Sequence, residues 1–181
     1  MNGWDYSRHG IYFITICVHQ KSCLFGSVIK GKMKLNAPGE MVRDAWANMP
    51  RFNPGLVQDV FVVMPNHFHA IVGLIDSSIT DANISSAHAS GSNISAAIPT
   101  VSTKKKPAHL SNIVRKFKTF TMNQYKQGVN QLGWIPYNKH LWQRSYADHI
   151  IEAERDLQNH REYVFYNPLK WHLDRMNPRF K

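Results

Sequence analysis

The chain has 181 residues, of which 43% are hydrophobic, 12% aromatic and 19% charged. This composition is typical of a folded globular protein and excludes a disordered or collagen-like chain, while the length suits one domain better than two large ones. The apolar runs at 11–18 and 70–75 are too short to span a membrane, and charges interrupt the amino-terminal stretch, so we expect neither a membrane anchor nor an export signal. The two cysteines, Cys17 and Cys23, lack the spacing of a zinc finger, which fits a reducing cytoplasm.

Basic residues are unevenly distributed along the chain. The sequence has 22 Lys and Arg against 12 Asp and Glu, a formal net charge of +10, and no acidic residue lies between Asp81 and Asp148. A local excess of Lys and Arg is expected of a protein that binds a polyanion, because binding releases the counterions condensed on phosphates. The alternative is a face that only keeps the protein in solution.

The first half of the chain predicts strands and one helix. β-branched and aromatic residues at 10–18 predict a strand, and helical spacing of apolar residues predicts a helix over 37–49 that ends near Pro50. Further strand-like segments lie at 24–29 and 32–35, which form a hairpin turning at Lys30-Gly31, and at 58–64 and 67–75, which flank Pro65-Asn66.

The second half begins with a stretch rich in Ser, Ala, Ile, Asn and Gly, from about 77 to 106, which predicts a low-complexity insertion. Helical spacing returns over 110–127, a strand is predicted over 142–150, and a helix over 152–167 is stopped by Pro168. Together these segments predict one α+β domain over 1–181, with helices packed on an antiparallel sheet.

The most informative local feature is His67-Phe68-His69 at the start of a predicted strand. Alternate residues of a strand project to one side, so both imidazoles face one way and Phe68 faces the other, toward the core. Two converging imidazoles can hold a divalent ion and leave positions open for water or a phosphate oxygen. Two hydrogen-bonded surface histidines are the alternative.

The last predicted helix carries Tyr163 and Asn167, which are four residues apart and therefore share one helical face. A tyrosine can attack phosphorus, although its reference pKa of about 10 means that it needs help to ionise. Tyr163 is also compatible with an amphipathic residue whose hydroxyl is hydrated. Tyr166 is a rival for the same role, and spacing alone does not choose between the two.

Five motifs in order resemble the REP-associated tyrosine transposases, a branch of the single-tyrosine HUH superfamily. They cover nearly the whole chain apart from the insertion. The matching segments are Tyr6-Ser with 10–17 near the start, Val62-Val-Met-Pro-Asn-His-Phe-His69, Ile113-Val-Arg-Lys-Phe-Lys118, the segment 141–151 beginning Leu-Trp-Gln-Arg, and Arg161-Glu-Tyr-Val-Phe-Tyr-Asn-Pro-Leu-Lys-Trp171.

The resemblance implies a ferredoxin-like (RRM-like) antiparallel sheet of the HUH endonuclease type and a metal-dependent reaction. Matched by motif, His67, His69 and Asn167 are expected to bind Mg²⁺ or Mn²⁺, and Tyr163 is expected to be the nucleophile. Tyr166 matches a position that is not nucleophilic. Asn167 agrees with the REP-associated branch, because the insertion-sequence relatives tend to have Gln there.

The family's activity is cleavage and rejoining of single-stranded DNA that carries hairpins, through a 5′-phosphotyrosine intermediate. We therefore expect single-stranded DNA as the partner, a monomer or homodimer in the cytoplasm, and no membrane association. The candidate contacts to the DNA backbone are Arg115, Lys116, Lys118 and Arg144. The alternatives are a catalytically inactive hairpin-binding protein of the same fold and, more distantly, an RNA-binding module that stacks bases on an aromatic sheet.

Overall fold

The computed structural model describes residues 10–75 and 109–180, so the predicted insertion at 77–106 and the Tyr6-Ser motif lie outside the described residues. The strands are β1 (Gly10–Cys17), β2 (Gly26–Ile29), β3 (Lys32–Leu35), β4 (Leu56–Val63), β5 (His67–Leu74) and β6 (Ala147–Ile151). The helices are α1 (Ala37–Ala47), α2 (Met49–Phe52), α4 (Leu110–Leu132) and α5 (Glu154–Tyr166), and the short 3-10 turns are η1 (His19–Lys21) and η2 (Trp171–Leu173).

Four strands form one antiparallel sheet in the order β4-β5-β1-β6. β1 therefore lies inside the sheet, between β5 and β6, which both come much later in the chain. This order, with helices in the crossovers, is the ferredoxin-like arrangement, and the predicted α+β fold class is confirmed. β2 and β3 form a separate hairpin that turns at Lys30-Gly31, both at positive φ.

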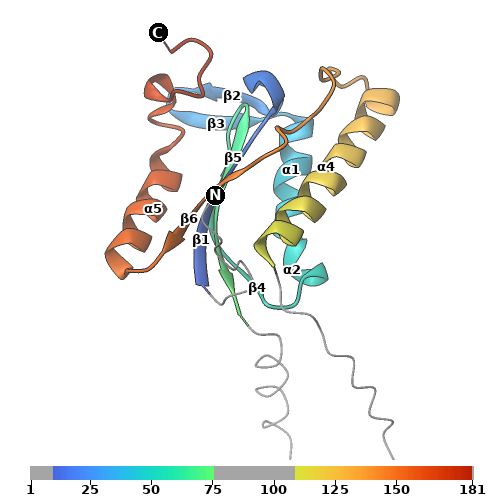
Figure 1. Cartoon of the computed structure of the whole chain (residues 1–181). Coiled ribbons are helices and arrows are strands. Elements are labelled where there is room, and N and C mark those ends of the chain that lie inside the picture. The colour runs from blue at the N-terminus through green and yellow to red at the C-terminus, as the bar shows by residue number, and fades with distance from the viewer. Residues whose placement is uncertain (1–9, 76–108, 181) are drawn as a thin grey trace, which may run out of the picture.

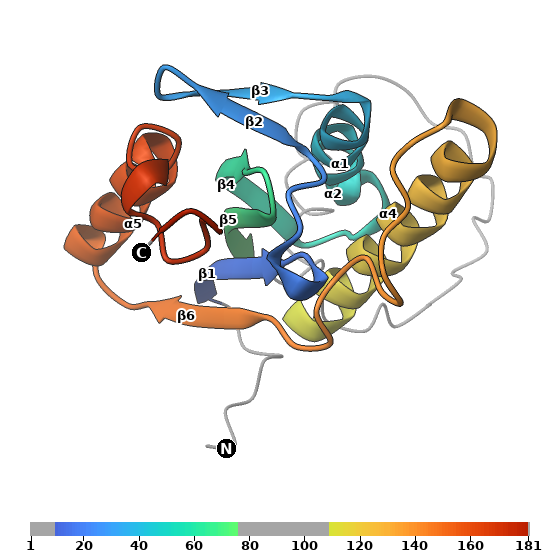
Figure 2. The same cartoon turned by 90° about the horizontal axis from the view of Figure 1, so that it is seen from above.

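Helices cover both faces of the sheet (Figure 1). α1, α2 and α4 pack on one face, and α5 packs on the other beside β4, β5 and β6. Seen from above, the β2–β3 hairpin crosses one end of the sheet between the two helical layers (Figure 2). Because both faces are covered, β5 is buried over almost its whole length, which explains its nearly continuous apolar sequence.

Alternation along β5 divides the interior into two clusters. Phe68 faces α1 and α4. Its ring centroid lies 4.9 Å from that of Trp46 and 5.2 Å from that of Phe117, and all three side chains are fully buried. Ile71 points to the other face and packs with Leu157 of α5. His67 and His69 share the side of Ile71, so the histidines lie between the sheet and α5.

Three of the predicted elements depart most from the structure, while other boundaries shift by one or two residues. α4 continues past Gln127, because Gly128 lies inside the helix where the ring of Trp134 fills the space of a side chain, and the helix ends at Gly133 in the left-handed conformation. The last strand begins at Ala147 instead of position 142, since Trp142 forms only an isolated bridge with Val18.

The predicted helix over 37–49 is two helices that meet at Asn48. Pro50 lies in the first turn of α2, where a missing backbone N–H costs nothing, so it starts a short helix after the first one ends. None of the helices that the structure describes is long and apolar enough to cross a membrane.

Candidate active site

The two histidines of β5 face α5 side by side. His67 is opposite Cys17 and His69 is opposite Thr15 on β1, and the centroids of the two imidazole rings are 4.6 Å apart. His67 is fully buried and His69 is 4% exposed. Phe68, between them, points into the main core, as the strand alternation predicts.

Hydrogen bonds at Nδ1 orient both imidazoles. His67 Nδ1 lies 2.9 Å from Asn66 Oδ1, an acceptor, so His67 carries its proton on Nδ1. Asn66 is itself held, because its amide donates to the carbonyls of Lys21 and Met176 at 2.8 and 2.7 Å. His69 Nδ1 lies 2.8 Å from the hydroxyl of Thr15. Both Nε2 atoms are left to face the site, which is the arrangement that metal-binding histidines use.

α5 brings Tyr163 and Asn167 to the same place. The ring of Tyr163 meets that of His69 edge to face, with centroids 5.3 Å apart. The centroid of the Phe13 ring lies 5.8 Å from that of Tyr163 and 5.2 Å from that of His69, on which Phe13 stacks. Asn167 follows one turn later and is 4% exposed. The rival Tyr166 turns its ring against Phe165 at 5.0 Å and does not line the cavity at the histidines.

An aspartate that the sequence analysis did not select completes this group. After α5 the chain turns through η2 and returns toward β5, which places Asp174 Oδ2 3.7 Å from His67 Nε2. The other carboxylate oxygen, Oδ1, accepts a hydrogen bond from the backbone N–H of Met176 at 2.7 Å. Asp174 is therefore fixed with one oxygen directed at the site.

Four buried polar atoms on the residues of this site have no hydrogen-bond partner: His67 Nε2, His69 Nε2, Asn167 Oδ1 and Asp174 Oδ2. Leaving buried polar atoms unpaired is costly, and four in one place indicate that something else satisfies them. Two imidazole nitrogens and two oxygens form a donor set that suits a divalent cation such as Mn²⁺. The residues present therefore fit the metal that the sequence motifs imply.

Burial keeps the two imidazoles neutral, as metal ligands must be. Desolvation lowers the pKa of His67 to about 4, against the opposing effects of Asp174 and Asn167. Desolvation and the neighbouring His67 lower the pKa of His69 well below its usual value. Burial, followed by the charge of Asp174, raises the pKa of Tyr163, so its hydroxyl stays protonated until a positive charge approaches.

These groups open into a cavity of about 480 Å³ on the α5 side of the sheet. Phe13, Thr15, His69, Tyr163 and Asn167 form part of its wall, together with Asp174. The cavity also borders Lys170 and Arg175, two exposed basic residues that the sequence analysis did not select. Positive charge beside the candidate nucleophile suits a phosphate.

The four predicted DNA contacts lie away from this cavity, on α4 and the segment before β6. Lys118 donates to the carbonyls of Gln143, Arg144 and Ser145 at 2.7, 3.1 and 3.0 Å, which occupies all three of its ammonium protons. Arg115 and Arg144 are exposed, and Arg115 donates to Asn112 at 3.3 Å.

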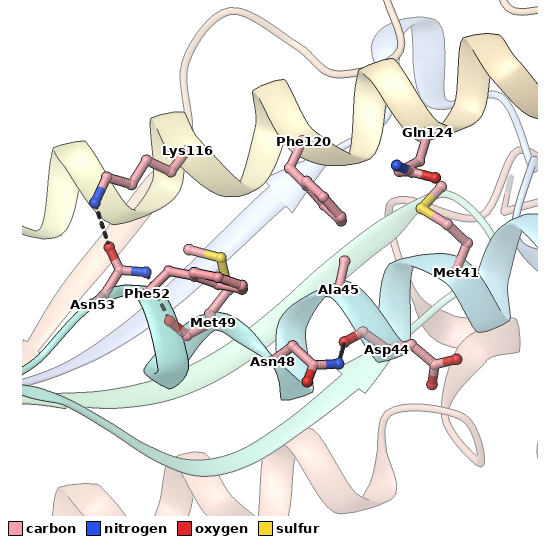
Figure 3. Close-up of a pocket in the computed structure, with 10 residues that line it drawn as sticks. All are labelled: Met41, Asp44, Ala45, Asn48, Met49, Phe52, Asn53, Lys116, Phe120 and Gln124. Atoms are coloured by element: carbon pink, nitrogen blue, oxygen red, sulfur yellow. Dashed lines mark hydrogen bonds between the residues drawn. The ribbon is translucent and has the colours of Figure 1, made fainter.

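Lys116 turns toward the groove between α4 and the α1–α2 pair, where its ammonium donates to Asn53 at 2.9 Å (Figure 3). Phe52 and Phe120, which are 71% and 50% exposed, line the same groove with Met41 and Met49. The groove therefore lies on the opposite face of the sheet from Tyr163.

No family model matches the chain. It is 34% identical over 176 residues to an uncharacterized protein of Haemophilus influenzae, a match that covers 96% of this chain and 88% of that protein. A second Haemophilus influenzae protein, provisionally named a REP-associated tyrosine transposase, is 47% identical over 30 residues, which is 17% of each chain.

The fold resembles that of a solved REP-associated tyrosine transposase bound to a REP hairpin. The similarity has a TM-score of 0.57, covers 94% of this chain and 74% of the other, and accompanies 19% sequence identity. The resemblance that the sequence motifs indicate is confirmed, and so is the fold that it implies.

Proposed function

Because the chain belongs to one family with the uncharacterized Haemophilus influenzae protein and has the fold of a REP-associated tyrosine transposase, we propose that it cleaves and rejoins single-stranded DNA beside hairpins. The four unpaired buried atoms next to Tyr163 carry this proposal. A protein that only binds hairpins has no need of such a group. We place the reaction in the cytoplasm, in a single domain.

His67, His69 and Asn167 are proposed to hold Mg²⁺ or Mn²⁺, with Asp174 as a fourth donor. His67 and His69 each offer Nε2, and Asn167 and Asp174 each offer an oxygen. Asn66 and Thr15 hold the rings from behind, so little reorganisation is needed on binding. When bound, the ion would neutralise charge on the scissile phosphate and favour ionisation of the nearby phenol.

Tyr163 is proposed to attack the phosphorus in line. The proton of Tyr163 Oη passes to solvent, the new Oη–P bond forms and the bond from phosphorus to the 3′-oxygen breaks. The 3′-oxygen takes up a proton from solvent, which leaves a 3′-hydroxyl and a 5′-phosphotyrosine. Contacts of the ring with those of His69 and Phe13 orient the Tyr163 hydroxyl for the attack. A second 3′-hydroxyl can reverse the step and join a different strand, because the phosphotyrosine keeps the energy of the original phosphodiester.

Two groups of basic residues are proposed to bind DNA at different places. Lys170 and Arg175 border the cavity and would meet the phosphates next to the cleaved bond. Arg115, Lys116 and Arg144 would contact the backbone of the hairpin farther away. Lys118 donates hydrogen bonds to three backbone carbonyls, so we propose that it holds the segment 143–145 in place instead of binding DNA.

Incubation with hairpin-bearing DNA tests the proposal. With Mn²⁺ or Mg²⁺, a DNA strand labelled at its 3′ end, which belongs to the downstream fragment, should become covalently attached to the protein and migrate with it on a denaturing gel. The same oligonucleotide as RNA, and the DNA with a chelator, are the controls. Binding without any covalent product, over a range of hairpins and flanking sequences, would favour the inactive hairpin-binding protein.

A further inference from the structure

A second group of metal-ligating side chains lies outside the candidate active site. His149 of β6 and Asp156 and His160 of α5 place one ligand atom each within 4.8 Å of one another. His149 Nε2 lies 2.8 Å from Asp156 Oδ2, and His160 Nδ1 lies 3.0 Å from Asp156 Oδ1. Together these three residues are called the β6–α5 cluster here.

The backbone builds the β6–α5 cluster from two directions. Asp156 and His160 are four residues apart and share one face of α5. His149 is opposite Phe13 in the sheet and therefore projects toward the same helix. The two imidazoles stack with centroids 4.8 Å apart and planes inclined by 22°, and their nitrogens contact the two different oxygens of the Asp156 carboxylate.

The distances in this cluster are close to those of a zinc site. In tetrahedral zinc the ligand atoms lie about 2.0–2.2 Å from the ion, and therefore about 3.4 Å from each other. The observed nitrogen–oxygen distances of 2.8 and 3.0 Å need to open by about half an ångström to reach this value. Each ring would move the proton that now faces Asp156 to its other nitrogen, or release it to solvent. His160 Nδ1 would also give up its 2.9 Å hydrogen bond to the backbone carbonyl of Asp156.

Charge and accessibility also suit a cation. Hydrogen bonding from His149, followed by the charges of the two histidines, lowers the pKa of Asp156, so the carboxylate is ionised. The side chains of His149, Asp156 and His160 are 53%, 33% and 21% exposed, which gives an ion a path from solvent. Arg161, in the next turn, pairs with Asp59 instead and leaves Asp156 to the histidines.

We propose that His149, Asp156 and His160 bind a Zn²⁺-class transition-metal ion, with water in the fourth position, and that the ion fastens the first half of α5 to β6. Two imidazoles and one carboxylate favour Zn²⁺, Co²⁺ or Ni²⁺ over Mg²⁺. The site is separate from His67 and His69, and it does not depend on DNA cleavage. An ion here would stabilise the turn that precedes Tyr163.

The test compares the wild-type protein with His149→Gln/His160→Gln. Glutamine can keep a hydrogen bond to Asp156 but is a poor zinc ligand, and both histidines are accessible enough for the variant to fold. After equilibration with Zn²⁺ and removal of free metal, bound zinc should fall by one equivalent per chain in the variant, with affinity at this site lowered by about 100-fold or more. Zn²⁺ should also slow amide hydrogen exchange across 154–163 in the wild type and leave the variant unchanged.

His140→Gln is the matched control, because His140 is also exposed and lies beside a histidine, His19, with ring centroids 5.6 Å apart. This variant should keep the wild-type zinc content. Equal zinc content and equal exchange in the wild type and the His149→Gln/His160→Gln variant would overturn the proposal. The cluster would then be a hydrogen-bonded His–Asp–His network without metal.

Discussion

Tyr163 and His69 meet edge to face, with ring centroids 5.3 Å apart, although the first belongs to the last helix and the second to a central strand. We predict that Tyr163→Phe abolishes the covalent DNA adduct, because the ring keeps its packing and only the attacking oxygen is lost. The adduct is measured with labelled DNA on a denaturing gel. Hairpin binding, measured by a mobility shift, should stay within about 2-fold of the wild type, since affinity depends mainly on phosphate contacts.

Tyr166→Phe is the control for this experiment. Tyr166 contacts Phe165 and does not line the cavity, so its hydroxyl should be dispensable for cleavage. Persistence of the adduct in Tyr163→Phe, together with its loss in Tyr166→Phe, would show that Tyr166 is the nucleophile and that Tyr163 is not.

Replacement of either site histidine separates cleavage from binding. His67→Ala or His69→Ala should lower the cleavage rate by about 100-fold or more, because each removes a metal ligand. Hairpin affinity should remain near that of the wild type, since neither histidine is among the basic residues proposed to contact the DNA backbone. A parallel loss of binding and of the cooperative unfolding transition would show that the histidines are structural.

Asp174 is predicted to contribute to metal affinity. Asp174→Asn keeps an oxygen for the backbone N–H of Met176 and removes the negative charge 3.7 Å from His67 Nε2. We expect the affinity for Mn²⁺ to fall by about 10-fold, as measured by calorimetry or electron paramagnetic resonance of free Mn²⁺. An unchanged Mn²⁺ affinity would remove Asp174 from the donor set and leave Asn167 as the oxygen ligand.

Stability of the metal-free protein should fall in mild acid. Burial lowers the pKa of His67 from 6.5 to about 4, so the unfolded chain takes up this proton before the folded chain does. The stability present above pH 6.5 is therefore lost as the pH falls toward 4, by about 2 kcal/mol from this residue between about pH 7.5 and pH 5. Urea unfolding across this range measures the loss, and His67→Gln should show a shallower pH dependence than the wild type.

Lys118 and Arg144 are predicted to act differently, although both are basic residues on the same side of the molecule. Lys118→Met should lower the free energy of unfolding by about 1–3 kcal/mol, because three carbonyls of the segment 143–145 lose their donor. Arg144→Ala should leave stability unchanged, weaken hairpin binding and reduce its salt dependence by about one phosphate contact. If Lys118→Met weakened hairpin binding and Arg144→Ala lowered stability, then Lys118 would be the DNA contact and Arg144 the structural residue.

Local patterns in the sequence predicted most of the fold. Alternation at 10–18 and 67–75 located β1 and β5, and it placed His67 and His69 on one side with Phe68 on the other. The errors came where a distant contact overrides a local preference. α4 passes through Gly128 because Trp134, which comes later in the chain, packs against it.

The candidate site was predicted only as far as motifs and spacing reach. The spacing of four placed Tyr163 and Asn167 on one face, and the motif match favoured Tyr163 over Tyr166. The packing of α5 on the sheet supports the same choice. Asp174 carried no signal, because it reaches His67 through a turn after the last helix. The hydrogen bonds from Lys118 to backbone carbonyls could not be predicted either, since the sequence of a basic segment does not indicate which oxygens a lysine will contact.

Phe13 stands between the two groups of histidines. Its ring contacts His69 and Tyr163 on one side and His160, at 4.7 Å, on the other. The width of this one aromatic spacer sets how closely the tyrosine-bearing helix can settle on the sheet. Replacing Phe13 with a smaller residue would keep every proposed ligand and the nucleophile in the chain, but it would change the separation between α5 and the strands that carry the histidines. A change near one histidine group would therefore reach the other through Phe13, which takes no part in the proposed chemistry.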